Sequence, residues 1–92
     1  MDTETRKLRD LAGVGRAMEE DFHLLGIRTV EALASSDGDL LYKKLCAKKK
    51  VHQDPCVLDT FRCAVAQARN PKLPIEQRNW WWWSRRRKAG KA

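Results

Sequence analysis

Residues 11–15 read LAGVG, and residues 24–27 read LLGI. Two glycines separated by a single residue, Gly13 and Gly15, predict a tight turn, because glycine adopts a positive φ without strain and lets other groups approach the backbone. A short helix is expected before the turn, over residues 3–10. After the turn, apolar residues at spacings of four, four and three predict a second, amphipathic helix: Val14, Met18, Phe22 and Leu25. Gly26 stands where a C-terminal cap is expected.

Helical signals continue along the chain. Thr29 is expected to cap a short helix over residues 30–34, and a further helix is expected over residues 39–47. Asp54 and Pro55 predict a helix start, because the aspartate caps the helix and proline lacks the N–H that would go unpaired there. The helix that follows carries the most regular apolar stripe of the chain: Val57, Phe61, Ala64, Val65 and Ala68.

No segment shows the alternating pattern of a strand, so residues 1–70 are expected to form a compact all-α domain of five helices. Residues 71–92 differ in composition. Pro74 is expected to open a last short helix that ends at Trp83, and from Ser84 onward the basic chain is expected to be disordered. We therefore expect one domain followed by a tryptophan-rich segment and a basic tail.

The 92 residues contain 19 Lys and Arg against 12 Asp and Glu, a net charge of +7. Most acids lie before residue 40, so the rest of the chain is strongly basic and indicates an anionic partner: nucleic acid first, a membrane surface second. The alternative is a globular domain with a basic surface. A chain this short leaves little room for a deep substrate pocket, which argues against a large metabolic enzyme. No apolar run reaches the roughly 18–20 residues of a membrane span, and the acidic start is unlike a signal peptide, so a cytoplasmic protein is expected.

Three cysteines are an odd number and too few for a disulfide scaffold. Cys56 and Cys63 lie about 10 Å apart along one expected helix, too far for a disulfide, so only Cys46 can pair with either of them. Reduced thiols are therefore expected. Together with His52 these residues invite a zinc site, but their spacing is not that of zinc ligands, and packing between helices is favoured. Cys56 lies near a helix start and is expected to have a lowered pKa.

The stretch over residues 6–28 resembles the helix-hairpin-helix motif of many DNA-repair and recombination proteins, with Ala12 in place of the usual proline. The resemblance implies that main-chain N–H groups of the turn reach a phosphate, and that its carbonyl oxygens can hold a monovalent cation. The residues concerned are Gly13, Val14, Gly15 and Arg16. Such contacts read the backbone and not the bases, so binding is expected to be independent of sequence. Other copies of the motif serve only for packing or protein contacts, and this alternative stays open.

Residues 39–69 repeat the layout as two helices around a basic turn. In a second copy of the hairpin, three side chains would replace the main-chain N–H groups as phosphate ligands: Lys48, Lys49 and Lys50. A solvated lysine run explains the same residues equally well. Asp37 follows the glycine turn at the distance of the catalytic aspartate in some helix-hairpin-helix glycosylases. A chain of this size has no room for a base-flipping pocket, however, so no enzymatic activity is expected.

A more specific resemblance covers most of the chain. It rests on LRDLAGVG over residues 8–15, LLGI over 24–27, LYKKLC over 41–46 and QDPCVLDTFRCAV over 53–65, followed by the tryptophan-rich end. These segments are similar to the small bacterial pathogenicity locus family of helix-hairpin-helix proteins, some of which are labelled mitomycin resistance proteins. The resemblance implies an all-helical, SAM-like fold near that of the C-terminal domain of competence regulators, and no established enzymatic activity.

Four consecutive tryptophans occupy residues 80–83, and three arginines follow: Arg85, Arg86 and Arg87. Neighbours on a helix are about 100° apart, so four rings cannot all face the core. Trp80 and Trp83 are expected to pack inward, with Trp81 or Trp82 outward. The rings can enlarge the core, stack on bases with the arginines on the backbone, contact a partner protein or a second copy, or bind at a membrane interface.

These features predict non-enzymatic, sequence-independent DNA binding through the glycine turn, the three lysines and the three arginines. The alternative is a protein–protein interaction module in which the hairpin is architectural and the tryptophans over residues 80–83 make the contacts.

Overall fold

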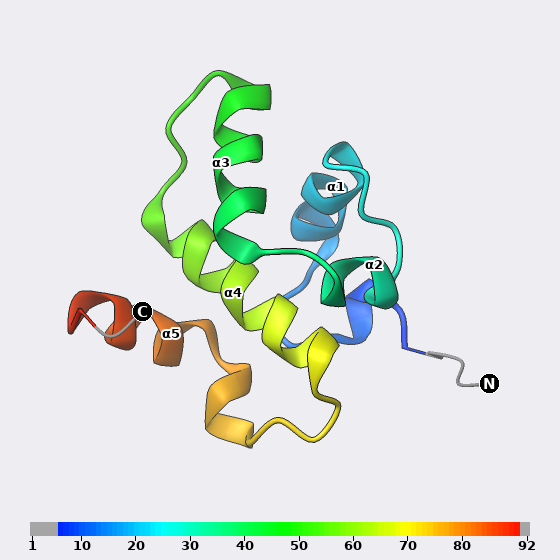
Figure 1. Cartoon of the computed structure of the whole chain (residues 1–92), viewed down its shortest axis with the longest axis vertical. Coiled ribbons are helices and arrows are strands. Elements are labelled where there is room, and N and C mark those ends of the chain that lie inside the picture. The colour runs from blue at the N-terminus through cyan, green and yellow to red at the C-terminus, as the bar shows by residue number, and fades with distance from the viewer. Residues whose placement is uncertain (1–5, 91–92) are drawn as a thin grey trace.

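The computed structural model describes residues 6–90, and every regular element in that range is a helix (Figure 1). Five are α-helices: α1 (Arg16–Leu24), α2 (Val30–Ala34), α3 (Gly38–Lys49), α4 (Pro55–Arg69) and α5 (Trp80–Lys88). Two are short 3-10 helices: η1 (Leu8–Asp10) and η2 (Ile75–Arg78). This part of the chain is thus a compact all-α domain, as predicted. None of its helices is both long and apolar enough to cross a bilayer.

The helix α4 is the centre of the domain, and α2, α3 and α5 all pack against it (Figure 1). Its predicted apolar stripe is confirmed, because four of the five residues are buried and the fifth is partly buried: Phe61, Ala64, Val65 and Ala68, then Val57. The Phe61 ring centroid lies 5.2 Å from that of Phe22 in α1. Both rings are fully buried, and each contributes about 1.5–3 kcal/mol by leaving water, so this contact joins α1 to α4.

Local capping chemistry places several helix ends where the sequence predicts them. Gly26 has a φ of +84°, and Ile27 folds back onto the core, which ends α1. Thr29 Oγ1 accepts a hydrogen bond from the Ala32 N–H at 3.0 Å and so begins α2. The Asp54 carboxylate caps α4 in the same way.

The helix α3 is longer than the one predicted over residues 39–47. The Asp37 carboxylate accepts main-chain hydrogen bonds of the first turn, so the helix begins at Gly38. A Cβ on Gly38 would lie 3.1 Å from the Cα and N atoms of Arg62, so the missing side chain lets α3 approach α4 closely. At its other end the helix continues to Lys49, two residues into the basic run that the pattern assigns to the turn.

The first predicted helix, over residues 3–10, is only a single 3-10 turn, η1, in its described part. Residues 3–5 of that prediction lie outside the described residues. The Lys7 N–H donates to Asp10 Oδ2 at 2.7 Å and Asp10 N–H to the Lys7 carbonyl at 2.8 Å, and these two bonds close one turn. The two apolar residues of this segment are buried, as predicted: Leu8 and Leu11.

Three predictions for the C-terminal segment are wrong, and one of them is that Trp80 packs inward, because this ring is 42% exposed. Pro74 is followed by the 3-10 helix η2, and the α-helix begins only at Trp80. That helix, α5, continues to Lys88, whereas disorder was expected from Ser84 onward; residues 91–92 lie outside the described range. The physical reason is contact with α4, which buries Ser84 and supplies the stabilisation that composition alone does not reveal.

Candidate nucleic-acid interface

The glycine turn (residues 11–15) is hydrogen-bonded to a side chain of α4. The Gln67 side chain accepts a hydrogen bond from the Ala12 N–H and donates one to the Ala12 carbonyl, both at 2.9 Å. Gly13 has a φ of +86°, a conformation that a side chain would strain. Val14, one of the residues predicted to take part in binding, is 5% exposed and packs into the core beneath the turn. Its side chain therefore supports the turn and does not reach its surface. The turn is therefore held rigidly in one conformation.

The start of α1 is open to solvent. Gly15 occupies the N-cap position, where no side chain accepts a hydrogen bond, and the first intrahelical bond is that from the Glu19 N–H. Within residues 6–90 the N–H groups of Gly15, Arg16 and Ala17 have no acceptor. A Cβ placed on Gly15 would meet nothing within 4 Å. This end of α1 can thus receive an acceptor from outside the chain.

The surface around these amides carries both signs of charge. The Arg16 side chain is 83% exposed, and its Nε lies 3.4 Å from Glu20 Oε2 one turn along the helix. Arg9 Nη1 lies 3.5 Å from Glu19 Oε1. Since both arginines are largely exposed, these ion pairs are weak and can be exchanged for a phosphate. The carboxylates Glu19 and Glu20 are accordingly paired with cations of the same surface.

The groups of the turn that would hold a monovalent cation are its carbonyl oxygens, and two of them accept hydrogen bonds from the chain. Its Leu11 carbonyl accepts a hydrogen bond from the Val14 N–H at 3.1 Å, and its Ala12 carbonyl accepts one from Gln67. Two of the turn's carbonyl oxygens thus each accept one hydrogen bond from the chain, which leaves each of them one lone pair.

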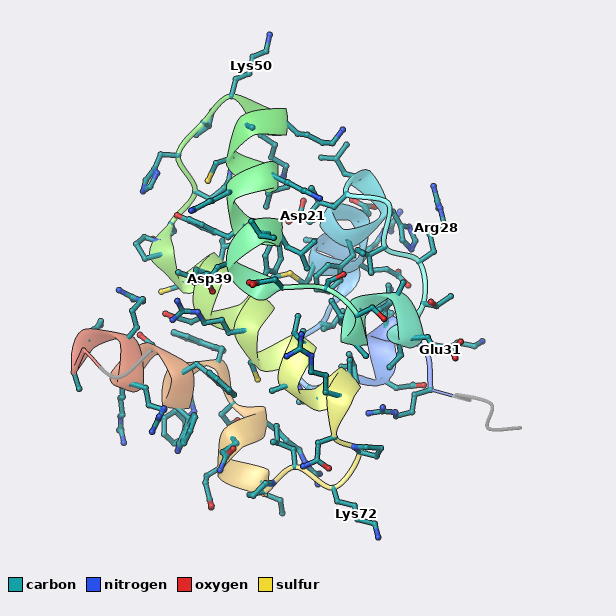
Figure 2. The ribbon with its side chains drawn as sticks, viewed as in Figure 1. Asp21, Arg28, Glu31, Asp39, Lys50 and Lys72 are labelled. Carbon is teal, nitrogen blue, oxygen red and sulfur yellow. The ribbon has the colours of Figure 1, made fainter. Side chains whose placement is uncertain are left out.

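The predicted lysines lie at the end of α3, and of the three, Lys49 contacts α1. Lys49 Nζ is 2.9 Å from Asp21 Oδ1, so this lysine joins α3 to α1. Lys48 is exposed in the last turn of α3. Lys50 ends the helix with a left-handed φ of +53°, and its side chain projects away from the domain (Figure 2).

The second turn, between α3 and α4, is closed to an anion. Asp54 Oδ1 accepts a hydrogen bond from the Cys56 N–H at 2.8 Å, so a carboxylate of the chain itself occupies the start of α4. Donation by that main-chain N–H holds the pKa of Asp54 below its usual value. The two helix–turn–helix segments therefore share a layout but differ in what covers the start of their second helix.

The three C-terminal arginines divide between surface and core. The Arg85 guanidinium lies over the Trp81 ring, 4.7 Å from its centroid, and Arg86 lies over Trp82 at 4.8 Å. Arg87 points inward and forms two hydrogen bonds with the Asp59 carboxylate, at 2.9 and 3.0 Å.

The pair formed by Arg87 and Asp59 fastens α5 to α4. Asp59 is 0% exposed, and its hydrogen bonds raise the pKa of the Arg87 guanidinium. The sequence pattern missed this contact because the partners are 28 residues apart. It missed Gln67, 55 residues from Ala12, for the same reason. The one available signal was a polar residue within the apolar run of α4.

The remaining candidate residues have structural roles. Burial raises the pKa of the Cys63 thiol to about 11. The pKa of Cys56 is raised by the neighbouring Asp54 side chain, so the predicted lowering at a helix start is wrong. Asp37 caps α3. Within the described residues no three His, Cys, Asp or Glu side chains come together as metal ligands would.

A family model described as Cdd1, Pathogenicity locus, matches residues 1–89. The chain belongs to this family. Membership of the Pathogenicity locus family confirms the resemblance drawn from the sequence. The chain is also 38% identical over 61 residues to a protein named "Mitomycin resistance protein McrB" from Streptomyces lavendulae. That alignment covers 66% of this chain and 58% of the relative, so the chain spans little more than half of that protein's length. No solved structure matches the chain.

Proposed function

We propose that this chain is a non-enzymatic DNA-binding domain that holds the sugar-phosphate backbone independently of base sequence. In this proposal residues 6–28 form a helix-hairpin-helix within a SAM-like domain. The observation that carries it is the open start of α1, where the N–H groups of Gly15, Arg16 and Ala17 lack acceptors on an exposed, rigid turn.

A phosphate suits this position for two reasons. Main-chain N–H groups at a helix start donate hydrogen bonds outward, and the helix dipole places partial positive charge there. The Arg16 side chain, 83% exposed, can add a charge-assisted hydrogen bond to the same or a neighbouring phosphate. None of these groups distinguishes one base from another, so the proposed binding is independent of sequence and weakens steeply with salt.

The other predicted cations contribute unequally in this proposal. Lys48, Lys50 and Arg85 are exposed, and they add long-range attraction for a polyanion. Lys49 and Arg87 already hold Asp21 and Asp59, so we assign them to the stability of the fold.

The most direct test replaces Gly15 with aspartate. The new carboxylate would cap α1 as Asp54 caps α4, and the geometry allows it because Gly15 has a φ of −94° and open space around its Cβ position. Stability should hold or rise slightly, while affinity for a short DNA duplex should fall by roughly tenfold or more, because a fixed negative charge stands where the phosphate would bind.

Gly15→Asn is the matched control, since its side chain has the same shape and caps the helix without the charge. It should retain more affinity than Gly15→Asp at every salt concentration. A second pair of variants makes the same charge change at two places. Arg16→Glu is the test, at the glycine turn, and Lys72→Glu is its control, at a lysine that projects from the 70–74 loop (Figure 2). Equal duplex binding by wild type and Gly15→Asp, measured by fluorescence anisotropy across a salt series, would overturn the proposal.

A second candidate function is a protein–protein interaction module. It is favoured by two exposed rings, Trp80 at 42% and Trp81 at 41%. Under this alternative the wild type shows no duplex binding at low salt, and light scattering shows an assembled mass that is lost when Trp80 and Trp81 are both replaced.

A further inference from the structure

The tryptophan run divides into an inward and an outward half. Trp83 is half-buried, and its Nε1–H donates to the Gln77 carbonyl at 2.9 Å. Trp82 meets the Trp83 ring edge-on at a centroid distance of 5.0 Å. Trp80 and Trp81 remain about two-fifths exposed. Two rings thus serve the fold and two are left at the surface.

The outward face of α5 combines aromatic rings with cations. Trp81, Arg85 and Lys88 stand at i, i+4 and i+7, so they share one face of the helix. The Arg85 guanidinium lies over the Trp81 ring, and α5 contains no acidic residue. Of the carboxylates near this helix, Asp59 is taken by Arg87 and Asp54 by the start of α4. Within residues 6–90 Arg85 forms no ion pair with a carboxylate.

We propose that this face of α5, formed by Trp81, Arg85 and Lys88, is a second DNA site that binds unpaired nucleotides. The inference rests on the proposed function, because it extends DNA binding from the duplex backbone to single strands. The Trp81 ring stacks on a base, and Arg85 and Lys88 contact phosphates. The Arg85 guanidinium covers one face of the Trp81 ring, so in this proposal the base stacks on the other face.

The composition of the face favours this partner over two others. A second copy of the chain would bring its own Arg85 and Lys88 against the same cations, and like charges in one contact are repelled. A bilayer would gain little apolar burial, because only two of the four rings are largely exposed and α5 has no other apolar side chain to insert. A single strand of DNA matches both the rings and the positive charge.

The test compares a short single-stranded oligodeoxynucleotide with an abasic strand of equal length, using the full chain. The two strands carry the same phosphates, but only the first has bases to stack. We expect tighter binding and stronger quenching of tryptophan fluorescence with the first strand. Trp81→Leu keeps an apolar side chain without the ring, and it should weaken binding of the base-containing strand roughly tenfold while leaving the abasic strand unchanged.

The control is Ile75→Ala, which removes an exposed apolar side chain of η2, 73% exposed, and should leave binding unchanged. Equal affinity for the two strands, or equal binding by wild type and Trp81→Leu, would overturn the inference, as would binding to phosphatidylserine vesicles but to neither strand. Gly15→Asp separates this result from the proposed function. It should weaken binding to duplex and leave the Trp81-dependent part of single-strand binding intact.

Discussion

The starts of α1 and α4 are built on the same plan and finished in opposite ways. Each follows a short turn, and each helix packs one ring of the Phe22 and Phe61 pair into the core. At α4 the Asp54 carboxylate accepts the Cys56 N–H. At α1 the corresponding residue is Gly15, which has no side chain to offer. The difference teaches that one helix start is completed by a side chain of its own turn, whereas the other keeps main-chain N–H groups that no group of the described residues accepts.

The start of α3 belongs with that of α4. It is capped by Asp37, and its glycine, Gly38, is packed against the backbone of Arg62. Gly15 has nothing within 4 Å of its Cβ position. The two glycines therefore have different physical reasons: Gly38 permits close packing between helices, and Gly15 leaves main-chain groups accessible.

The largest expected effect comes from adding one methyl group at each glycine. Gly38→Ala should destabilise the domain by about 1–3 kcal/mol, because its Cβ would lie 3.1 Å from the Cα and N atoms of Arg62 in α4, so the two helices would have to separate by a few tenths of an ångström. Gly15→Ala should cost less, roughly 0.5 kcal/mol, because its Cβ meets open space at an ordinary φ and only the preference for glycine over alanine at an N-cap is lost. Urea unfolding followed by circular dichroism measures both, and equal effects would contradict the distinction drawn here between the two glycines.

A smaller effect is expected from acid. Because the Cys56 N–H lowers the pKa of Asp54 in the folded state, the cap contributes stability above the unfolded pKa of about 3.9 and loses it as the pH falls through the folded pKa. Asp39, whose pKa is lowered by its hydrogen bonds to Arg62, behaves in the same way. The Tm of the wild type should therefore decrease when the pH is lowered below about 4.

Asp54→Asn isolates the start of α4 in this pH series, since asparagine caps without titrating. The fall in Tm between pH 5 and pH 2 should be smaller by a few degrees in this variant, with the Asp39 part retained. Superimposable thermal-melting profiles for the two proteins would show that the Asp54 charge adds nothing to the cap.

The smallest expected effect is on a thiol. Asp54 raises the pKa of Cys56, so Asp54→Asn should lower it and speed alkylation of Cys56 at pH 8 by roughly a factor of two. Cys63 is an internal control, because burial raises its pKa to about 11 and should keep it slow in both proteins. Peptide mapping after timed exposure to iodoacetamide follows each cysteine, and an unchanged Cys56 rate would remove the charge of Asp54 as the cause.

Features that depend on neighbouring residues were predictable. Gly26, Thr29 and Asp54 act within four residues of their own positions, so their caps are readable from the chain. The central helix α4 was readable for a similar reason, because its apolar stripe repeats with the period of a helix. The boundaries of α3 and the reduction of the first helix to one turn were not, since competing side-chain bonds and packing decided them.

The candidate sites were predictable only in part. The glycine turn is visible in the sequence, but the Gln67 clamp that holds it comes from α4, 55 residues away. From its composition, the segment from Ser84 onward is predicted to be disordered. In the fold Arg87 pairs with the buried Asp59, and this pair helps to hold the segment as part of α5. The same buried ion pair, the Trp83 hydrogen bond to Gln77 and the burial of Ser84 hold α5 in the rotation that leaves Trp80 and Trp81 exposed.

Short-range chemistry in the amino-acid order was enough to specify an all-helical chain, its caps, the glycine turn and the surplus of positive charge. Only folding decided that Gln67 holds the glycine turn and which rings and arginines reach the surface. The reason is that a main-chain amide or a guanidinium is engaged by the group that packs against it, and for this protein those partners, Gln67 and Asp59, are brought close by the three-dimensional fold alone.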